Sequence, residues 1–510
     1  MKPTMETETN RAIESGGRYW KAWTALPLVL LLLLLASTSG HINILDDEVL
    51  MLNAAVAPVA QTLHAFAIGV GQHEHPPLSD LLLHAWWSLV PGSLFWLRLP
   101  FIACYVAAFA MLALLAERLA GPRAAVVLAW LALLSPFGFH FGHLLGWYSV
   151  ALLLVAVLTY CHARWLEEGS LTWGALAWIA AVLLLYTNYF AWVLVGLLAL
   201  DAALFRRSNR RWVAWLVSAG WLALLAIAFG PLWRSLLYLH QHPQVKVEGS
   251  KLVAYIFDMY ALLVSESFAP WFFAVGVPVA LLCAGCYVLT LLGTRGLPRR
   301  LLIYFLISTA LLAALGSINT KRLPFLMGWF LLPLAVALAE RTMPRLRRSL
   351  AVAVAVVFAV GWFGTVRGQY YASTHFIDDW EAAVAAAVAD HAGGGQLVYD
   401  HPVGAYYLAR ALDGPGSPYK GLDGCHDCGA KRADAWFADG HPGVRVVALR
   451  GVQYGLSQDP GDAYLDQSCR VESERHYTHD NAAAIKHRLF PRQIEPEWRV
   501  REIVYDCSAK

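Results

Sequence analysis

The chain is dominated by apolar runs, many of them long enough to cross a lipid bilayer. A helix needs about 20 apolar residues to span the hydrocarbon layer, and the first such run is Ala22–Ser39. Hydrophobic residues make up 58% of the 510 residues and charged residues only 15%, whereas soluble domains carry about 25% charged residues. The sequence therefore predicts a polytopic α-helical membrane protein.

Eleven of these runs are predicted to be transmembrane helices. They are Ala22–Ser39, Leu99–Leu115, Ala124–Phe141, Trp147–Trp165, Trp173–Tyr186, Phe190–Leu204, Trp212–Leu232, Trp271–Leu292, Leu301–Leu315, Leu323–Leu338 and Leu350–Val366. A cleaved signal peptide is the alternative for the first run, with a small-residue site at residues 36–40. An uncleaved anchor is favoured, because the preceding chain is long and partly acidic and further spans follow.

Clusters of arginine predict the orientation of the spans. The strongest clusters are Arg206–Arg211, Arg295–Arg300 and Arg341–Arg348, with a weaker one at Arg118–Arg123. All four can be cytoplasmic only if Leu78–Leu97 does not cross, so this segment is predicted to be an interfacial or re-entrant helix. Residues 1–21 are then cytoplasmic, residues 22–366 form the membrane domain, and the loops 40–97 and 233–270 face outward. The basic clusters are short and lie between apolar runs, so no nucleic-acid partner is predicted.

The composition changes at Arg367, and residues 367–510 are predicted to form a small extracytoplasmic α/β domain. A helix ending at Ala392 is expected, with Asp378 or Asp379 as its N-cap. Strands are expected over 396–400, 444–449 and 502–505. The domain holds Cys425, Cys428, Cys469 and Cys507; two disulfides are favoured over a redox or zinc motif, and all three pairings stay open.

Candidate chemistry gathers in the first outer loop, from Asp46 to Leu78. Asp47 and Glu48 directly follow the first span, and carboxylates beside a membrane are costly unless they face water or a ligand. Either carboxylate could act as a general base or hold a divalent ion; the alternative is a polar cap at the end of a span. His73 and His75 flank Glu74 before a rigid Pro-Pro pair and are candidates for binding substrate, with ordinary loop residues as the alternative. Asp47, Glu48, His73 and His75 are the candidate metal ligands.

Several basic and aromatic residues at outer span ends are candidates for binding substrate. Arg98 and Arg322 could each bind a phosphate through two hydrogen bonds. The pair Lys321-Arg322 breaks the positive-inside pattern, which favours a functional interpretation. His143 and Tyr148 are further candidates, and interfacial anchoring is the alternative for both. The long polar interruption between Leu232 and Trp271, with His240, His242, Lys246 and Glu248, is predicted to be a lid over the site.

Several short motifs, taken in order, resemble the GT-C glycosyltransferases. They are Asp47-Glu48, His75-Pro76-Pro77-Leu78, Arg98-Leu99-Pro100, Leu134-Ser135-Pro136-Phe137, Gly146-Trp147-Tyr148-Ser149 and Asp379-Trp380. The pattern is similar to that of bacterial relatives of the dolichyl-phosphate-mannose–protein mannosyltransferases and of the lipid A aminoarabinose transferase. Two positions differ from that pattern: His75 stands where the aminoarabinose-type loop has Lys, and the Arg expected near Gly146 is absent.

The resemblance implies a membrane glycosyltransferase in a bacterial inner membrane. Its donor would be a sugar on polyprenyl phosphate, and its acceptor lipid A, a polysaccharide, a glycolipid or a protein on the outer side. Asp47 matches the family's catalytic aspartate, and inversion at the anomeric carbon is implied. Two alternatives remain open: a transporter of lipid-linked sugars, which would favour charges buried within spans, and a non-catalytic scaffold, which would tolerate loss of Asp47.

Overall fold

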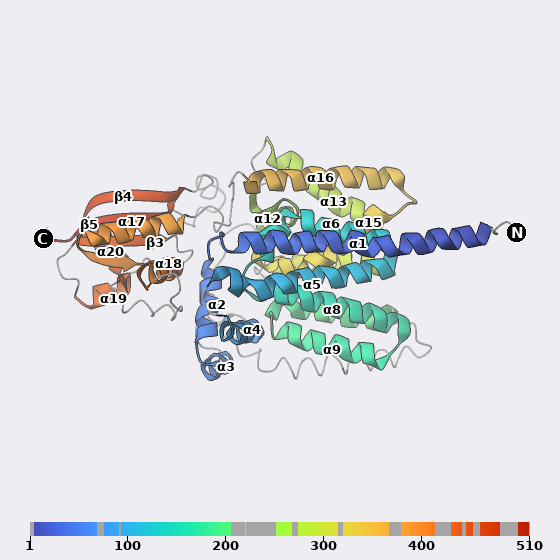
Figure 1. Ribbon diagram of the computed structural model, residues 1–510, viewed down its shortest axis with the longest axis horizontal. Helices are drawn as coiled ribbons and strands as arrows, with labels where there is room; N and C mark the ends of the chain where they lie inside the picture. The colour runs from blue at the N-terminus through green and yellow to red at the C-terminus, as the bar shows by residue number, and fades with distance from the viewer. Residues whose placement is uncertain are drawn as a thin grey trace.

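The protein consists of a long helical bundle with a small α/β domain at one end, and the N-terminus lies at the other end (Figure 1). The computed structural model describes residues 5–68, 76–90, 93–205, 220, 251–267, 274–314, 320–366, 379–413, 430–440, 445–451, 460–479 and 498–508. Below, the end that carries the α/β domain is called the outer end and the opposite end the inner end.

The bundle is built from apolar helices whose buried faces form one continuous core. They are α1 (Met5–Ser39), α5 (Leu94–Ala120), α6 (Pro122–Leu134), α7 (Pro136–Gly142), α8 (Trp147–Glu168), α9 (Leu171–Leu185), α10 (Trp192–Phe205), α13 (Gly276–Gly293), α14 (Gly296–Ala314), α15 (Met327–Ala339) and α16 (Pro344–Val366). Among the described residues, six helices are long and apolar enough to span a membrane, and α6 with α7, bent by 68°, makes a possible seventh. Three further apolar helices are shorter. The predicted span Trp212–Leu232 lies outside the described residues.

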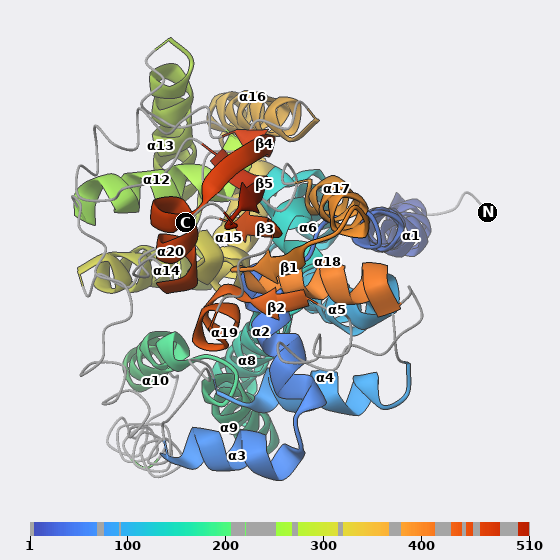
Figure 2. The ribbon, with the colours of Figure 1, turned by 90° about the vertical axis from the view of Figure 1, so that its left-hand side faces the viewer.

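Short helices cover the outer end of the bundle (Figures 1 and 2). They are α2 (Asp46–Val56), α3 (Val59–Ile68) and α4 (Leu78–Trp87). At 1.5 Å per residue, α4 is about 15 Å long, too short to cross a bilayer. The segment Leu78–Leu97 does not form one continuous helix, because α4 ends at Trp87 and α5 begins at Leu94.

The predicted lid differs from expectation, because part of it is ordered structure. Residues Lys251–Val264 form the helix α12, which packs against α14 and α16. Its second half is buried throughout, so this stretch belongs to the core and the prediction of a loop was wrong here. The apolar pattern of Leu252 to Val264 carried the helical signal. His240, His242, Lys246 and Glu248 lie outside the described residues.

The α/β domain contains a five-stranded sheet in the order β2-β1-β3-β5-β4. The strands are β1 (Gln396–Tyr399), β2 (Ala430–Arg432), β3 (Arg445–Gly451), β4 (Arg470–His479) and β5 (Trp498–Asp506). Strands β1, β2 and β3 are parallel, whereas β5 pairs antiparallel with β3 and β4. The helices are α17 (Trp380–Ala392), α18 (Pro402–Asp413), α19 (Ala433–Ala438) and α20 (Pro460–Ser468).

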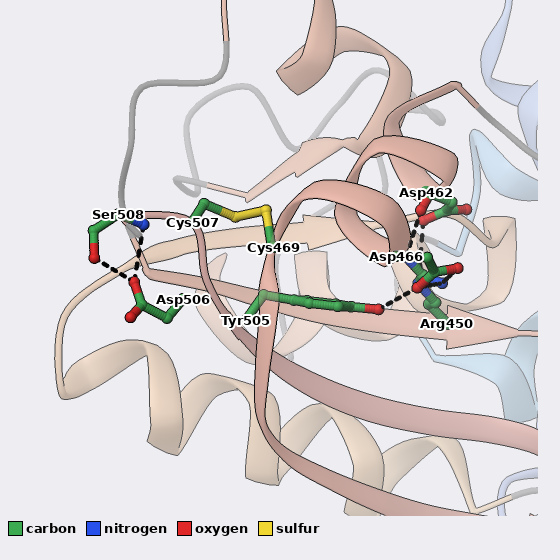
Figure 3. The surroundings of a disulfide bond; sticks show 8 residues. All are labelled: Arg450, Asp462, Asp466, Cys469, Tyr505, Asp506, Cys507 and Ser508. Atoms are coloured by element: carbon green, nitrogen blue, oxygen red, sulfur yellow. Dashed lines mark hydrogen bonds and ion pairs between the residues drawn. A yellow bond between two sulfur atoms is a disulfide. The ribbon is translucent and has the colours of Figure 1, made fainter. Parts of the chain in front are cut away.

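Local sequence signals in this domain are confirmed. The three predicted strands correspond to β1, β3 and β5, and the Asp379 side chain caps α17 by accepting from the Ala382 N–H at 3.0 Å. A disulfide joins Cys469 to Cys507 (Figure 3), which is one of the two predicted bonds. Cys425 and Cys428 lie outside the described residues. Beside the disulfide, Tyr505 donates to Asp466 at 2.6 Å and Arg450 binds the same carboxylate (Figure 3).

The two parts of the molecule share a hydrophobic core. Val49 and Leu52 of α2 and Phe101 of α5 belong to the same buried cluster as Trp380 and Tyr406 of the α/β domain. Apolar burial is the main source of folding free energy, so this shared core fixes the domain on the short outer helices. Helix α2 thus packs between the bundle and the domain.

Candidate functional site

Asp47 and Glu48 lie in the first turn of α2 and face different surroundings. Successive helical residues point about 100° apart, so two neighbouring carboxylates cannot share one direction. The Glu48 side chain is fully buried, whereas the Asp47 side chain is 37% exposed. Glu48 also caps its own helix by accepting the Leu45 N–H at 2.8 Å. The two carboxylates therefore have different roles available to them.

The Glu48 carboxylate forms a fork-to-fork ion pair with Arg98 of α5. Arg98 Nε lies 3.0 Å from Oε1 and Nη2 lies 2.7 Å from Oε2. The Leu145 N–H adds a bond of 2.7 Å to Oε1. The remaining Arg98 donors reach three backbone carbonyls just before α2, those of Ser39, Ile42 and Asn43, at 2.6–2.9 Å. A buried ion pair needs such complete hydrogen bonding to offset its desolvation.

This arrangement corrects two predicted roles. Arg98 is fully buried and its donors are engaged by protein atoms, so the structure does not present it to a phosphate. Both Glu48 oxygens accept bonds within the buried pair, so Glu48 does not face a substrate or a metal ion. Together the two residues hold in place the segment between the first span and α2. The sequence indicated the structural role of Glu48 in part, because a Glu in the first turn of a helix is a common cap.

Asp47 is held by two side chains from distant parts of the chain. Its Oδ2 lies 2.8 Å from Lys321 Nζ and accepts from the Tyr148 hydroxyl at 3.0 Å. Tyr148 can approach because Gly146 precedes it: Gly146 has φ 153°, and a Cβ there would lie 2.8 Å from the Tyr148 ring. The structure thus brings together three of the predicted site residues, Asp47, Tyr148 and Lys321.

Lys321 belongs to a short 3-10 turn, η3 (Thr320–Arg322), which is tied to a buried polar cluster. The Thr320 hydroxyl donates to the Glu266 carboxylate, and His140 Nε2 lies 3.8 Å from the same carboxylate. Glu266 is turned toward them at η2 (Ser265–Ser267), where Ser265 has the rare positive φ of 62° for a non-glycine residue. Glu266 was not predicted as a site residue, and only its position at the end of an apolar run signalled it.

The other candidate residues are placed as follows. Arg322 stacks over the Phe190 ring, with its Cζ 4.3 Å from the centroid. His143 is fully buried at the end of α7, rather than in an interfacial position. His73 and His75 lie outside the described residues, although the Leu78 N–H bond to the Tyr186 carbonyl at 3.1 Å fixes the end of their segment at the outer tip of α9.

A second polar cluster lies inside the bundle, nearer the inner end. The Asp201 carboxylate of α10 lies 2.9 Å from His162 Nε2 of α8 and 2.6 Å from Arg300 Nε of α14. The Tyr304 hydroxyl donates to it at 2.6 Å. These residues were not predicted. A lone Asp within an apolar run implies a buried partner, which was the available signal.

The described residues contain no group of three or more His, Cys, Asp or Glu side chains arranged to hold a metal ion. Of the four candidate ligands, Glu48 does not fit, because its oxygens are already bound, and Asp47 is paired with Lys321.

The chain is similar to known proteins in part of its sequence and in its fold. Residues 74–233 match the family model described as dolichyl-phosphate-mannose-protein mannosyltransferase. No curated protein matches the chain. ArnT from Cupriavidus metallidurans in the apo state has a similar fold, with a TM-score of 0.51 at 13% identity, covering 96% of this chain and 98% of that one.

A second ArnT structure from the same organism, bound to undecaprenyl phosphate, matches with a TM-score of 0.51 at 14% identity, covering 95% of this chain and 98% of that one. At such identities the likeness concerns the fold. The resemblance to the GT-C glycosyltransferases is thus confirmed, in sequence over residues 74–233 and in fold over nearly the whole chain.

Proposed function

We propose that this protein is a membrane glycosyltransferase that moves a sugar from a polyprenyl-phosphate donor to an envelope acceptor. The reaction would occur on the outer side of a bacterial inner membrane, with the N-terminus cytoplasmic and the α/β domain periplasmic. The observation that carries this proposal is the Asp47 carboxylate. It is partly exposed at the outer end of the bundle and held by a cation and a hydroxyl.

In this mechanism, Asp47 takes the proton from an acceptor hydroxyl. The hydroxyl oxygen attacks the anomeric carbon from the side opposite the phosphate, the bond between that carbon and the phosphate oxygen breaks, and the configuration inverts. Polyprenyl phosphate leaves with both electrons of the broken bond. Lys321 moves from Asp47 to the phosphate and stabilises its developing charge. Arg322, beside it on η3, is proposed to assist.

The location of the site supports a lipid-linked donor. A polyprenyl chain stays in the bilayer, so its phosphate is presented at the membrane surface, where the outer ends of α5, α8 and α15 meet the short helices α2 and α4 (Figure 2). The structural relative with undecaprenyl phosphate bound supports the same class of donor for this fold. A water-soluble sugar nucleotide would have no need of such a position.

The direct test is Asp47→Asn, produced in a strain that lacks the native protein. Glycolipid profiling by mass spectrometry of the deletion strain first identifies the product that is lost. We expect the purified Asp47→Asn protein to form that product about 10²–10⁴ times more slowly, as is typical for loss of a general base. Donor binding and the unfolding temperature should be unchanged, because Asn keeps the size and can still accept hydrogen bonds.

The control is Asp46→Asn, which removes the same charge one residue earlier. It should transfer at a near-normal rate. Near-normal transfer by Asp47→Asn would refute Asp47 as the base. Movement of a labelled lipid-linked sugar between leaflets, with no acceptor product formed, would instead favour the transporter alternative.

A further inference from the structure

The inner end of the bundle carries a basic cavity that the proposed reaction does not use. Its volume is about 570 Å³, within the usual range of about 300–1,000 Å³ for small-molecule sites. It lies among the turns that join α5 to α6, α13 to α14 and α15 to α16. All three turns are at the end of the bundle away from the α/β domain (Figure 1).

The cavity has an excess of positive charge. Arg123, Arg295 and Arg341 line it, against a single carboxylate, that of Glu340. Glu340 Oε1 accepts the backbone N–H groups of Arg341 and Thr342 at 2.9 and 3.0 Å; these bonds, and more weakly the charge of Arg295, lower the pKa of this carboxyl, so one negative charge faces three arginines. Within the described part of the chain, none of the three guanidinium groups has a carboxylate partner within 4 Å. Such an arrangement favours an anionic ligand.

A second cavity of about 570 Å³ adjoins the first and gives it an apolar side. The two share Pro122, Arg123 and Ala339 among their lining residues. The second adds Arg347 together with three aromatic residues of α1, Tyr19, Trp20 and Trp23. Tyr19 and Trp23 are 68% and 56% exposed, which is typical of aromatic side chains at the boundary between headgroups and hydrocarbon.

We propose that these joined cavities bind an anionic phospholipid. Its phosphate would lie between Arg123 and Arg341, where guanidinium groups can bind it through paired hydrogen bonds. Its acyl chains would lie against Val126, Val127 and Leu338. Basic pockets between transmembrane helices on the cytoplasmic side are suited to such headgroups. The apolar wall and exposed aromatic residues favour a lipid over a soluble phosphate compound.

The test uses the full-length protein purified in detergent and depleted of lipid. Phosphatidylglycerol is added, and retained lipid is counted by native mass spectrometry while the unfolding temperature is followed. We expect one tightly held phosphatidylglycerol and a higher unfolding temperature, with phosphatidylcholine giving neither. The variant Arg123→Ala/Arg341→Ala should bind phosphatidylglycerol about tenfold more weakly or worse, since two charge-assisted contacts are lost.

The matched control is Arg345→Ala/Arg348→Ala. It removes two exposed arginines from the start of α16, and neither lines the two joined cavities. Unchanged binding in this control is expected, and an equal loss would overturn the proposal in favour of diffuse attraction. An equal effect of inorganic phosphate on the unfolding temperature would overturn the lipid assignment. If the double variant does not fold, the single variant Arg341→Ala, in an exposed turn, decides: undiminished retention of phosphatidylglycerol would refute the proposal.

Discussion

Asp47 and Glu48 are neighbours in the sequence, yet burial separates their functions. Asp47 keeps water access and pairs with Lys321, whereas Glu48 is enclosed with both oxygens bound. A base must be reachable by the acceptor hydroxyl, and only Asp47 meets that condition. Glu48 and Arg98 instead act through the backbone, because they fix the residues that lead into α2.

Substitution of Glu48 should therefore lower the stability of the fold, whereas substitution of Asp47 should lower the transfer rate. Glu48→Gln should destabilise the fold by about 3–5 kcal/mol, because it leaves Arg98 as a buried charge without its partner. Thermal unfolding in detergent measures the change, and lost transfer should follow the lost folded protein. Arg98→Lys should behave in the same way, because a single ammonium cannot replace the fork.

Asp47→Asn provides the contrast, with the unfolding temperature kept and transfer lost. A stable Glu48→Gln protein whose transfer rate alone is reduced would contradict the structural role. It would return Glu48 to the catalytic candidates.

The resemblance singled out Asp47 as the base, but the residues alone left Glu48 as a second catalytic candidate. The motif shows two carboxylates after a span, while the partner that distinguishes them, Arg98, is 50 residues away. Tyr148 and Lys321 were identified as polar residues at outer span ends, although their contact with one carboxylate depends on how α8 and η3 pack. Burial of Glu266 and His140 beside them likewise arises only in the folded bundle.

Among the elements, α8, α10 and α14 are held together near the inner end by the Asp201 cluster. The buried Asp201 carboxylate binds His162 Nε2, Arg300 and the Tyr304 hydroxyl. Every donor in such surroundings must find an acceptor, because unmet polar groups are costly in lipid. The cluster is fully partnered at Asp201, which favours a structural role over a transport pathway.

Asp201→Asn should therefore lower the free energy of unfolding by about 1–3 kcal/mol, since a buried hydrogen-bonded charge is lost. The unfolding temperature measures this effect, and transfer by the folded fraction should be unchanged. Glu167→Gln is the matched control: its pair with Arg118 is exposed, and exposed pairs contribute about 0–1 kcal/mol. Equal losses in the two variants would show that burial of the Asp201 cluster does not matter.

Helices and strands were predicted correctly where the local sequence signal was strong. Apolar runs and the Asp379 cap gave helices, and β1, β3 and β5 were found because they are rich in Val, Ile, Leu and Tyr. Strand β4 was missed, because its sequence RVESERHYTH is charged and edge strands need not be apolar. Helix α12 was missed because its flanking polar residues suggested a loop.

In the whole molecule, a tyrosine of the α/β domain binds the residues that lead into α2. The Tyr407 hydroxyl of α18 donates to Asn43 Oδ1 at 2.9 Å and accepts the Ile44 N–H at 3.2 Å. Burial raises the pKa of this hydroxyl, so it remains a donor. The Asn43 carbonyl in turn accepts from Arg98. The residues before Asp47 are therefore held by the bundle on one side and by the domain on the other.

The shared core explains why this contact is stable. Apolar residues of α2 and α5 are buried with those of α17 and α18, so the domain is expected to move little relative to the site. This contact was not predictable, because Asn43 and Tyr407 are 364 residues apart and neither lies in a motif. The domain thus has a positioning role as well as any role in holding an acceptor.

Tyr407→Phe tests that positioning role. The change removes only the hydroxyl, which takes the acceptor from the buried Ile44 N–H and removes one hydrogen bond of the Asn43 side chain. A buried donor left without its acceptor costs about 1–3 kcal/mol. Because misplacement of a catalytic group by about 1 Å can cost 10²-fold in rate, we expect kcat to fall more than tenfold, with the KM for donor changed little and the protein still folded.

Tyr406→Phe is the control, since the Tyr406 hydroxyl accepts from Arg410 of the same helix at 3.1 Å and its loss should leave kcat near normal. Equal kcat values for the two variants would mean that the domain does not position Asp47, and that the shared apolar core alone holds the catalytic segment.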